Sequence, residues 1–114
     1  MASSVRLEIN AAKILGRVKR KWMENLPAIT TVIRADTNEY VKFDQGQLKQ
    51  SSYTASQPSR GLIIWNTPYA RKQYYEGRPR KVRNPKATIL WCEEAKRRHL
   101  KEWRNYVAER VTKR

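Results

Sequence analysis

The chain has 114 residues, and we expect them to form a single domain with one modest hydrophobic core, spanning residues 1–114. Lys and Arg number 25 against 10 Asp and Glu, so the formal net charge at pH 7 is +15. A surface with this charge repels itself, so we expect an acidic partner. Composition alone leaves open whether the partner is nucleic acid, an acidic protein or an anionic membrane surface.

The scarcity of cysteine and histidine argues against several kinds of chemistry. Cys92 is the only cysteine, so an intramolecular disulfide and a multi-cysteine zinc site are excluded. His99 is the only histidine, and a packed, hydrogen-bonded role fits it better than catalysis. Glu93 and Glu94 are typical of surface ion pairs. We therefore expect no enzyme, with no catalytic residues, no metal site and no cofactor.

The sequence shows neither a membrane-spanning segment nor a signal peptide. The chain contains no apolar run of about 18 residues, and its first residues lack the apolar region of a signal peptide. We expect a protein made in the cytoplasm that does not enter a membrane.

The first part of the chain predicts two helices. Residues 1–8 are expected to be flexible. Apolar residues at spacings of three and four then predict an amphipathic helix over residues 9–23, with Asn10 as its cap. Pro27 is expected to end or kink this helix. Residues 28–38 keep helical spacing, although their Thr and Ile content also suits a strand, and we favour a helix.

The middle of the chain predicts a turn and a hairpin. A short extended piece from Tyr40 leads to a turn at Asp44 and Gly46, followed by a loop or a single helical turn. Residues 51–55 and 61–65 are prone to form strands and predict an antiparallel hairpin. Residues 67–75 are expected to begin as a helical turn, with Thr67 as cap and Pro68 at its first position.

Residues 78–86 are strongly basic and contain no acidic residue. Five basic groups and two prolines in nine positions predict a loop rather than a core element. We expect either a solvated loop or a contact with DNA or an acidic protein surface. The candidate contact residues are Arg71, Lys72, Arg78, Arg80, Lys81, Arg83 and Lys86.

The last part of the chain predicts a long helix from Lys86 to about residue 112. Its apolar stripe includes Cys92, His99 and Trp103. The order of helices, hairpin and long helix predicts an α+β fold, in which N-terminal helices and a long C-terminal helix pack on a small antiparallel sheet. Tyr69, Tyr74 and Tyr75 suit either base stacking or the closure of a small core or interface.

Several short motifs resemble the minor capsid proteins of tailed bacteriophages. Residues 63–71 read Ile-Ile-Trp-Asn-Thr-Pro-Tyr-Ala-Arg, and Tyr-Tyr-Glu-Gly follows at 74–77. Asn-Pro-Lys-Ala at 84–87 and an aromatic, Ala-Lys and His pattern from residue 91 complete the resemblance. It assigns structural roles to Asp44, Gly46, Leu48, Trp65, Pro68, Tyr69, Ala70, Tyr74, Tyr75, Gly77 and Trp91.

The resemblance implies a structural virion protein of the phage neck. Such tail-completion or head-tail connector proteins form hexameric or dodecameric rings between the head connector and the tail tube. The expected partners are further copies of the chain, neighbouring neck and tail proteins, and genomic DNA in the lumen. Six copies would carry about +90, whereas a ring about 30–40 Å tall surrounds about 20 duplex phosphates, so most of the charge is expected to face protein. The alternative is a small basic nucleic-acid-binding module.

Overall fold

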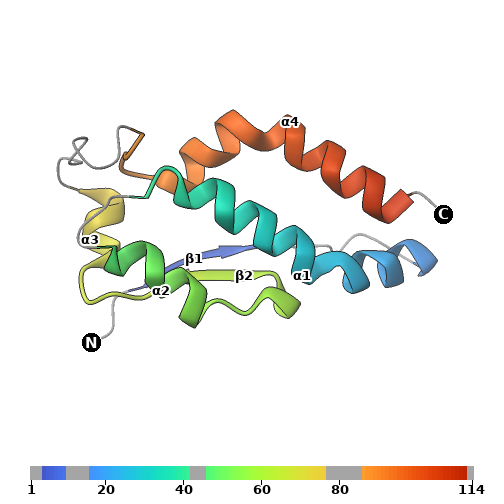
Figure 1. Cartoon of the computed structure of the whole chain (residues 1–114), viewed down its shortest axis with the longest axis horizontal. Coiled ribbons are helices and arrows are strands. Elements are labelled where there is room, and N and C mark those ends of the chain that lie inside the picture. Colours follow the sequence, from blue (N-terminus) through green and yellow to red (C-terminus); the bar gives the residue numbers. More distant parts are fainter. Residues whose placement is uncertain (1–3, 10–15, 42–45, 77–85, 113–114) are drawn as a thin grey trace.

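The computed structural model describes residues 4–9, 16–41, 46–76 and 86–112, and it has an α+β architecture (Figure 1). Asn10, the expected helix cap, lies outside these residues. The elements in chain order are β1 (Val5–Glu8), α1 (Gly16–Asn38), α2 (Gln47–Ala55), the 3-10 helix η1 (Pro58–Arg60), β2 (Leu62–Trp65), α3 (Ala70–Tyr75) and α4 (Trp91–Thr112). The expected combination of helices with a small antiparallel sheet is therefore confirmed.

Helix α1 runs through Pro27 without ending there. Proline removes one backbone donor and crowds the preceding turn, at a cost of about 3 kcal/mol. Pro27 lies on the exposed side of α1, where water can solvate the carbonyl that loses its partner. The opposite side buries Trp22, Leu26 and Ile29, so packing on both sides of the proline holds one continuous helix. The predicted helix over residues 28–38 is confirmed as the second half of α1.

The sheet joins two strands from distant parts of the chain. β1 pairs antiparallel with β2, with Val5 opposite Trp65 and Glu8 opposite Leu62. Two expectations are wrong here. Val5–Glu8 form a strand instead of a flexible segment, and the predicted helix does not begin at Ile9, whose amide bonds to the Gly61 carbonyl at 2.8 Å.

The predicted hairpin of residues 51–55 with 61–65 is also wrong. Residues 51–55 belong to helix α2, which buries Leu48, Ser51 and Ser52 on one side. These three positions have helical spacing, but two of the buried side chains are serines, so the spacing of apolar residues alone does not indicate the helix. Both hydroxyls bond to carbonyls three residues earlier in the chain, at 2.7 Å each.

Helix α4 lies along α1, and in Figure 1 α1 runs between α4 and the two strands. The predicted long helix is confirmed, but it begins at Trp91 rather than Lys86. Leu90, which precedes it, has a φ of 52°. Glu93 and Glu94 occupy the first turn, where carboxylates favour the partial positive charge of a helix N-terminus. Of the predicted stripe, Cys92 and Trp103 are buried.

Candidate interaction surfaces

The aromatic motif residues form the centre of the core. Trp65 on β2 and Trp91 at the start of α4 are both fully buried. Their rings meet edge to face, with centroids 5.9 Å apart. Tyr74 on α3 contacts Trp91 in the same way at 4.7 Å. Three elements that carry the family motifs are thereby joined through their rings, so these residues determine the fold rather than contact a partner directly.

Other motif residues divide between core and surface. Leu48 and Ala70 are buried, and Gly46 has a φ of 76° at the start of α2, a conformation that glycine adopts without strain. Tyr69 and Tyr75, in contrast, are exposed, as is Pro68. Asp44 and Gly77 lie outside the described residues. Helix α3 begins at Ala70, and Thr67 supplies a backbone carbonyl to the Ala70 amide rather than a side-chain cap.

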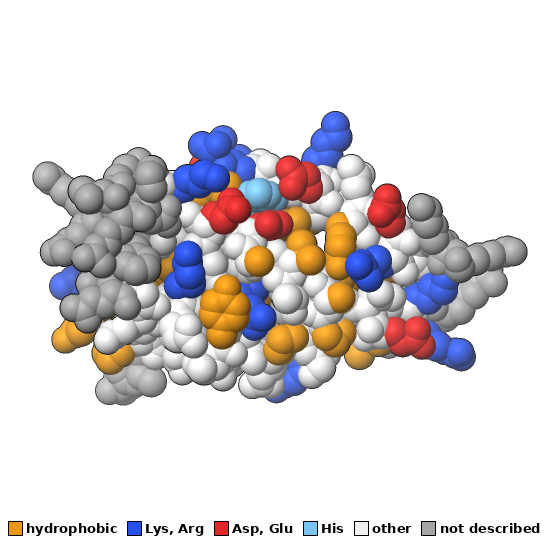
Figure 2. All heavy atoms as spheres, viewed as in Figure 1, with side chains coloured by type: hydrophobic (Ala, Val, Ile, Leu, Met, Phe, Trp, Pro, Cys, Tyr) orange, Lys and Arg blue, Asp and Glu red, His pale blue; other side chains and the backbone are white. Residues whose placement is uncertain are grey.

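His99 is packed and hydrogen-bonded between α1 and α4. Its Nε2 lies 2.9 Å from the hydroxyl of Tyr40, and its ring stacks on Trp103 with centroids 5.9 Å apart. Trp103 donates its Nε1–H to Asp36 at 2.7 Å. Figure 2 shows the histidine, in pale blue, beside acidic side chains on this face. The arrangement fixes the contact of the two helices.

Burial suppresses the acidity of the one thiol and of the tyrosine beside it. Burial raises the pKa of Cys92 from its ordinary value of 9.0 to about 12, against a smaller lowering by its hydrogen bond with Tyr74. Burial also raises the pKa of Tyr74 well above 10.0. Cys92 therefore stays a neutral thiol at physiological pH, which makes it a packing residue rather than a nucleophile.

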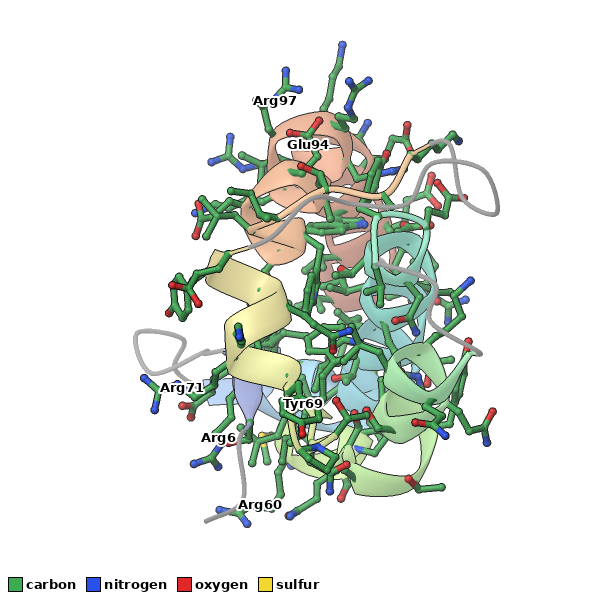
Figure 3. The ribbon with its side chains drawn as sticks, turned by 90° about the vertical axis from the view of Figure 1, so that its left-hand side faces the viewer. Arg6, Arg60, Tyr69, Arg71, Glu94 and Arg97 are labelled. Atoms are coloured by element: carbon green, nitrogen blue, oxygen red, sulfur yellow. The ribbon has the colours of Figure 1, made fainter. Side chains whose placement is uncertain are left out.

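One end of the molecule combines basic side chains with an exposed ring. Figure 3 looks at this end, where Arg6 of β1 and Arg71 of α3 reach outward near Tyr69, and β1 and α3 are in contact. All three residues are exposed, with Tyr69 at 69%. We call these three residues the basic end. Arg60, in η1 at the other end of β2, forms a hydrogen bond of 2.9 Å from its Nη1 to Gln57 and is not part of the basic end.

The candidate contact residues are thus only partly brought together. Arg71 belongs to the basic end, and Lys72 is exposed on the same short helix. Lys86 pairs with Glu39 at 3.7 Å, and both side chains are largely exposed, so this pair contributes little to stability. The candidates Arg78, Arg80, Lys81 and Arg83 lie outside the described residues.

Arg6 was not predicted from the sequence as a member of the basic end. No motif links it to Arg71, because it is brought near α3 by the pairing of β1 with β2. The alternation Val-Arg-Leu-Glu over residues 5–8 was the available signal, since alternating apolar and polar residues indicate a half-buried strand.

Within the described ranges, no three His, Cys, Asp or Glu side chains are placed to hold a metal ion. None of the described helices is long and apolar enough to cross a membrane.

Comparison with known proteins identifies the family. A family model described as minor capsid protein matches residues 5–111, which is nearly the whole chain. Neither the curated proteins nor the solved structures provide a significant match. The matched range includes all seven elements, from β1 into α4. The chain therefore belongs to the minor capsid protein family of bacteriophages and is a structural protein of the virion.

Proposed function

We propose that the protein is a tail-completion component of the phage neck, where copies form a ring between the head connector and the tail tube. The observation that carries this proposal is the family match over residues 5–111, to which the motif resemblance adds the neck role. The aromatic motif residues form a rigid core. A small rigid chain of this kind suits a structural subunit that binds its neighbours through complementary surfaces.

The basic end supplies a docking surface for such a role. Arg6 and Arg71 lie beside Tyr69, a large and rigid side chain of the kind enriched at interfaces together with arginine. Six copies would bring about +90 to a ring. Only about 20 duplex phosphates fit within a ring about 30–40 Å tall, at one per ~1.7 Å. We infer that the basic end meets an acidic protein surface of the neck, while a minority of the charge approaches the DNA.

Deletion of the gene from the phage tests the proposal. A neck component predicts that cells accumulate DNA-filled heads and separate tails, and that wild-type protein supplied from a plasmid restores joined particles. Heads that fail to form or to fill with DNA would contradict the neck role and indicate a function in capsid assembly or packaging.

Charge reversal then tests the basic end. The double variant Arg71→Glu/Lys72→Glu, which changes Arg71 of the basic end and the exposed lysine next to it on α3, should restore far fewer joined particles than wild type. Lys101→Glu/Arg104→Glu, on exposed positions of α4, is the matched control, because it changes the net charge equally. Equal complementation by the two variants would show that the basic end has no docking role.

A nucleic-acid-binding module is the second candidate function. The observation that favours it is the pair of exposed rings, Tyr69 and Tyr75, next to basic side chains on α3. This function predicts tight binding of free DNA that weakens steeply as salt rises. A neck component predicts weak binding, because tight binding in the lumen would hinder DNA passage.

A further inference from the structure

The two outer edges of the sheet differ in how their backbone groups are satisfied. On β2, the Leu62 amide and carbonyl both bond to Gln57, at 3.1 and 2.9 Å. The Ile64 amide bonds to the Ser56 hydroxyl at 2.9 Å, and the Asn66 amide bonds to the Ser51 hydroxyl at 3.2 Å. Helix α2 and the segment after it therefore close this edge against another strand.

The outer edge of β1 has no strand paired with it among the residues that the structure describes. The Ile9 amide bonds to Gly61, and backbone groups alternate in direction along a strand, so Val5, Leu7 and Ile9 direct theirs toward β2. Arg6 and Glu8 direct theirs away. Neither has a backbone hydrogen bond to any residue that the structure describes, and both side chains are exposed. An unpaired strand edge of this kind is a template for another strand.

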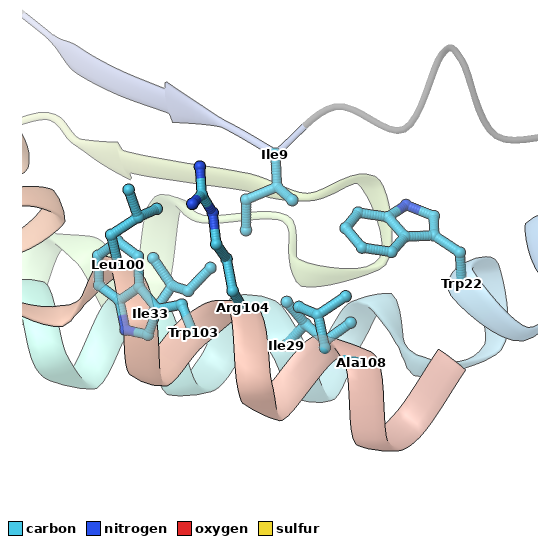
Figure 4. A pocket seen from close by; sticks show the side chains of 9 residues that line it. Ile9, Trp22, Ile29, Ile33, Leu100, Trp103, Arg104 and Ala108 are labelled. Atoms are coloured by element: carbon cyan, nitrogen blue, oxygen red, sulfur yellow. The ribbon is translucent and has the colours of Figure 1, made fainter. Parts of the chain in front are cut away.

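An apolar groove lies beside the open edge. Ile9, which follows β1 directly, lines it together with Trp22 and Ile29 of α1 and with Leu100 of α4 (Figure 4), and Val107 of α4 adds to the lining. Its volume is about 370 Å³, and its lining is almost entirely apolar. A strand added to β1 would extend the sheet on the side where this groove leaves apolar surface uncovered.

We propose that the strand that adds to β1 is β1 of a second copy of this chain. Within β1, Arg6 and Glu8 are the residues that direct backbone groups outward, so an antiparallel pair between two copies of this strand must form its hydrogen bonds between these residues. The register that achieves this sets Arg6 opposite Glu8 of the second copy and Glu8 opposite its Arg6, around a two-fold axis at Leu7. Opposite charges then face each other twice on one side of the sheet.

The apolar side chains match in the same register. Val5 of the second copy lies opposite Ile9, which lines the groove, and Leu7 lies opposite Leu7. These residues share the side of the sheet whose other members, Ile63 and Trp65, are buried in the core. The product is a four-stranded sheet in which β2 forms both closed outer edges. The contact is isologous, because both copies use the same residues. It forms in the free protein before assembly and is separate from the head-to-tail contacts that a ring requires.

A charge-swap cycle tests the pairing in solution by sedimentation velocity over a range of protein concentrations. Wild type should form a dimer of twice 13.5 kDa. Arg6→Glu and Glu8→Arg each place like charges opposite one another, so each should weaken the dimer about tenfold. The double variant Arg6→Glu/Glu8→Arg restores opposite charges and should return to near the wild-type affinity. Lys101→Glu and Glu109→Arg, on exposed positions of α4, are the matched controls and should leave the dimer unchanged.

Two further measurements separate pairing from misfolding. Glu8→Pro removes an outward amide that the fold does not use, so it should keep the circular dichroism of wild type but abolish the dimer. Amide hydrogen exchange at Arg6 and Glu8 should slow as protein concentration rises. A wild type that stays monomeric, single swaps without effect, or a double variant that is not restored would each overturn the proposal, whichever result the particle experiments give.

Discussion

The indole Nε1–H of Trp65 donates a hydrogen bond of 3.0 Å to Oδ1 of Asn38. The amide group of Asn38 in turn donates to the hydroxyl of Ser52 at 2.9 Å. All three side chains are buried. One asparagine at the end of α1 therefore joins β2 to α2 and fixes how the two motif-bearing segments meet.

Replacement of Asn38 should destabilise the protein strongly. Asn38→Ala leaves the buried Trp65 indole without its acceptor, whereas the Ser52 hydroxyl keeps its bond to the Lys49 carbonyl, and an unsatisfied buried polar group costs about 1–3 kcal/mol. We expect the free energy of unfolding, measured by urea titration, to fall by about that amount. Asn105→Ala, on an exposed position of α4, should change it by less than about 0.5 kcal/mol.

The bond between Trp103 and Asp36 should stabilise the contact of α1 with α4. Asp36→Ala removes a charge-assisted hydrogen bond of 2.7 Å, and bonds to charged groups contribute about 1.5–3 kcal/mol. Asp36→Asn keeps an acceptor oxygen and should lose less. Thermal unfolding of the two variants checks this order, and an equal loss in both would show that the carboxylate charge matters more than the hydrogen bond.

Gly61 should not tolerate a side chain. Its φ is +70°, and an added Cβ would lie 2.8 Å from the carbonyl oxygen of Ile9. The left-handed conformation alone costs an L-residue about 1–2 kcal/mol, and the close contact adds to that cost. Gly61→Ala should therefore lower the free energy of unfolding by at least that amount, whereas Ser59→Ala in the same turn should have little effect. Unchanged stability of Gly61→Ala would contradict the described turn.

Alkaline pH should weaken the fold through Cys92. The unfolded thiol ionises near pH 9, whereas the folded thiol has a pKa of about 12. Between these values the unfolded state loses a proton that the folded state keeps, so stability is complete below pH 9 and falls as pH rises, by about 1.4 kcal/mol per pH unit. Cys92→Ala should show a shallower fall in urea titrations over this range. Equal slopes would show that the thiol is not buried in solution.

The helices with regular apolar spacing could be predicted from the sequence. The second half of α1 and most of α4 follow the spacing of Ile29, Ile33 and Trp103, because burial of those residues determines where the helices pack. Pro27 misled the prediction, because the local cost of a proline is smaller than the packing of the long helix around it.

The sheet and the basic end could not be predicted in the same way. β2 pairs with a strand more than 50 residues earlier, and propensity carries no information about which strands pair. Ser51 and Ser52 are buried because their hydroxyls bond to the backbone, so the helix that contains them lacks an apolar stripe. Arg6 joins Arg71 only once the sheet has formed, so no sequence motif marks the surface.

The most direct test of the neck role is the number and position of copies in the virion. Quantitative mass spectrometry of purified particles, with cryo-electron microscopy of the head-tail junction, measures both. A neck component should be present in about six or twelve copies, located in a ring between the head connector and the tail tube. Absence from the virion, or a copy number in the hundreds spread over the capsid shell, would contradict it.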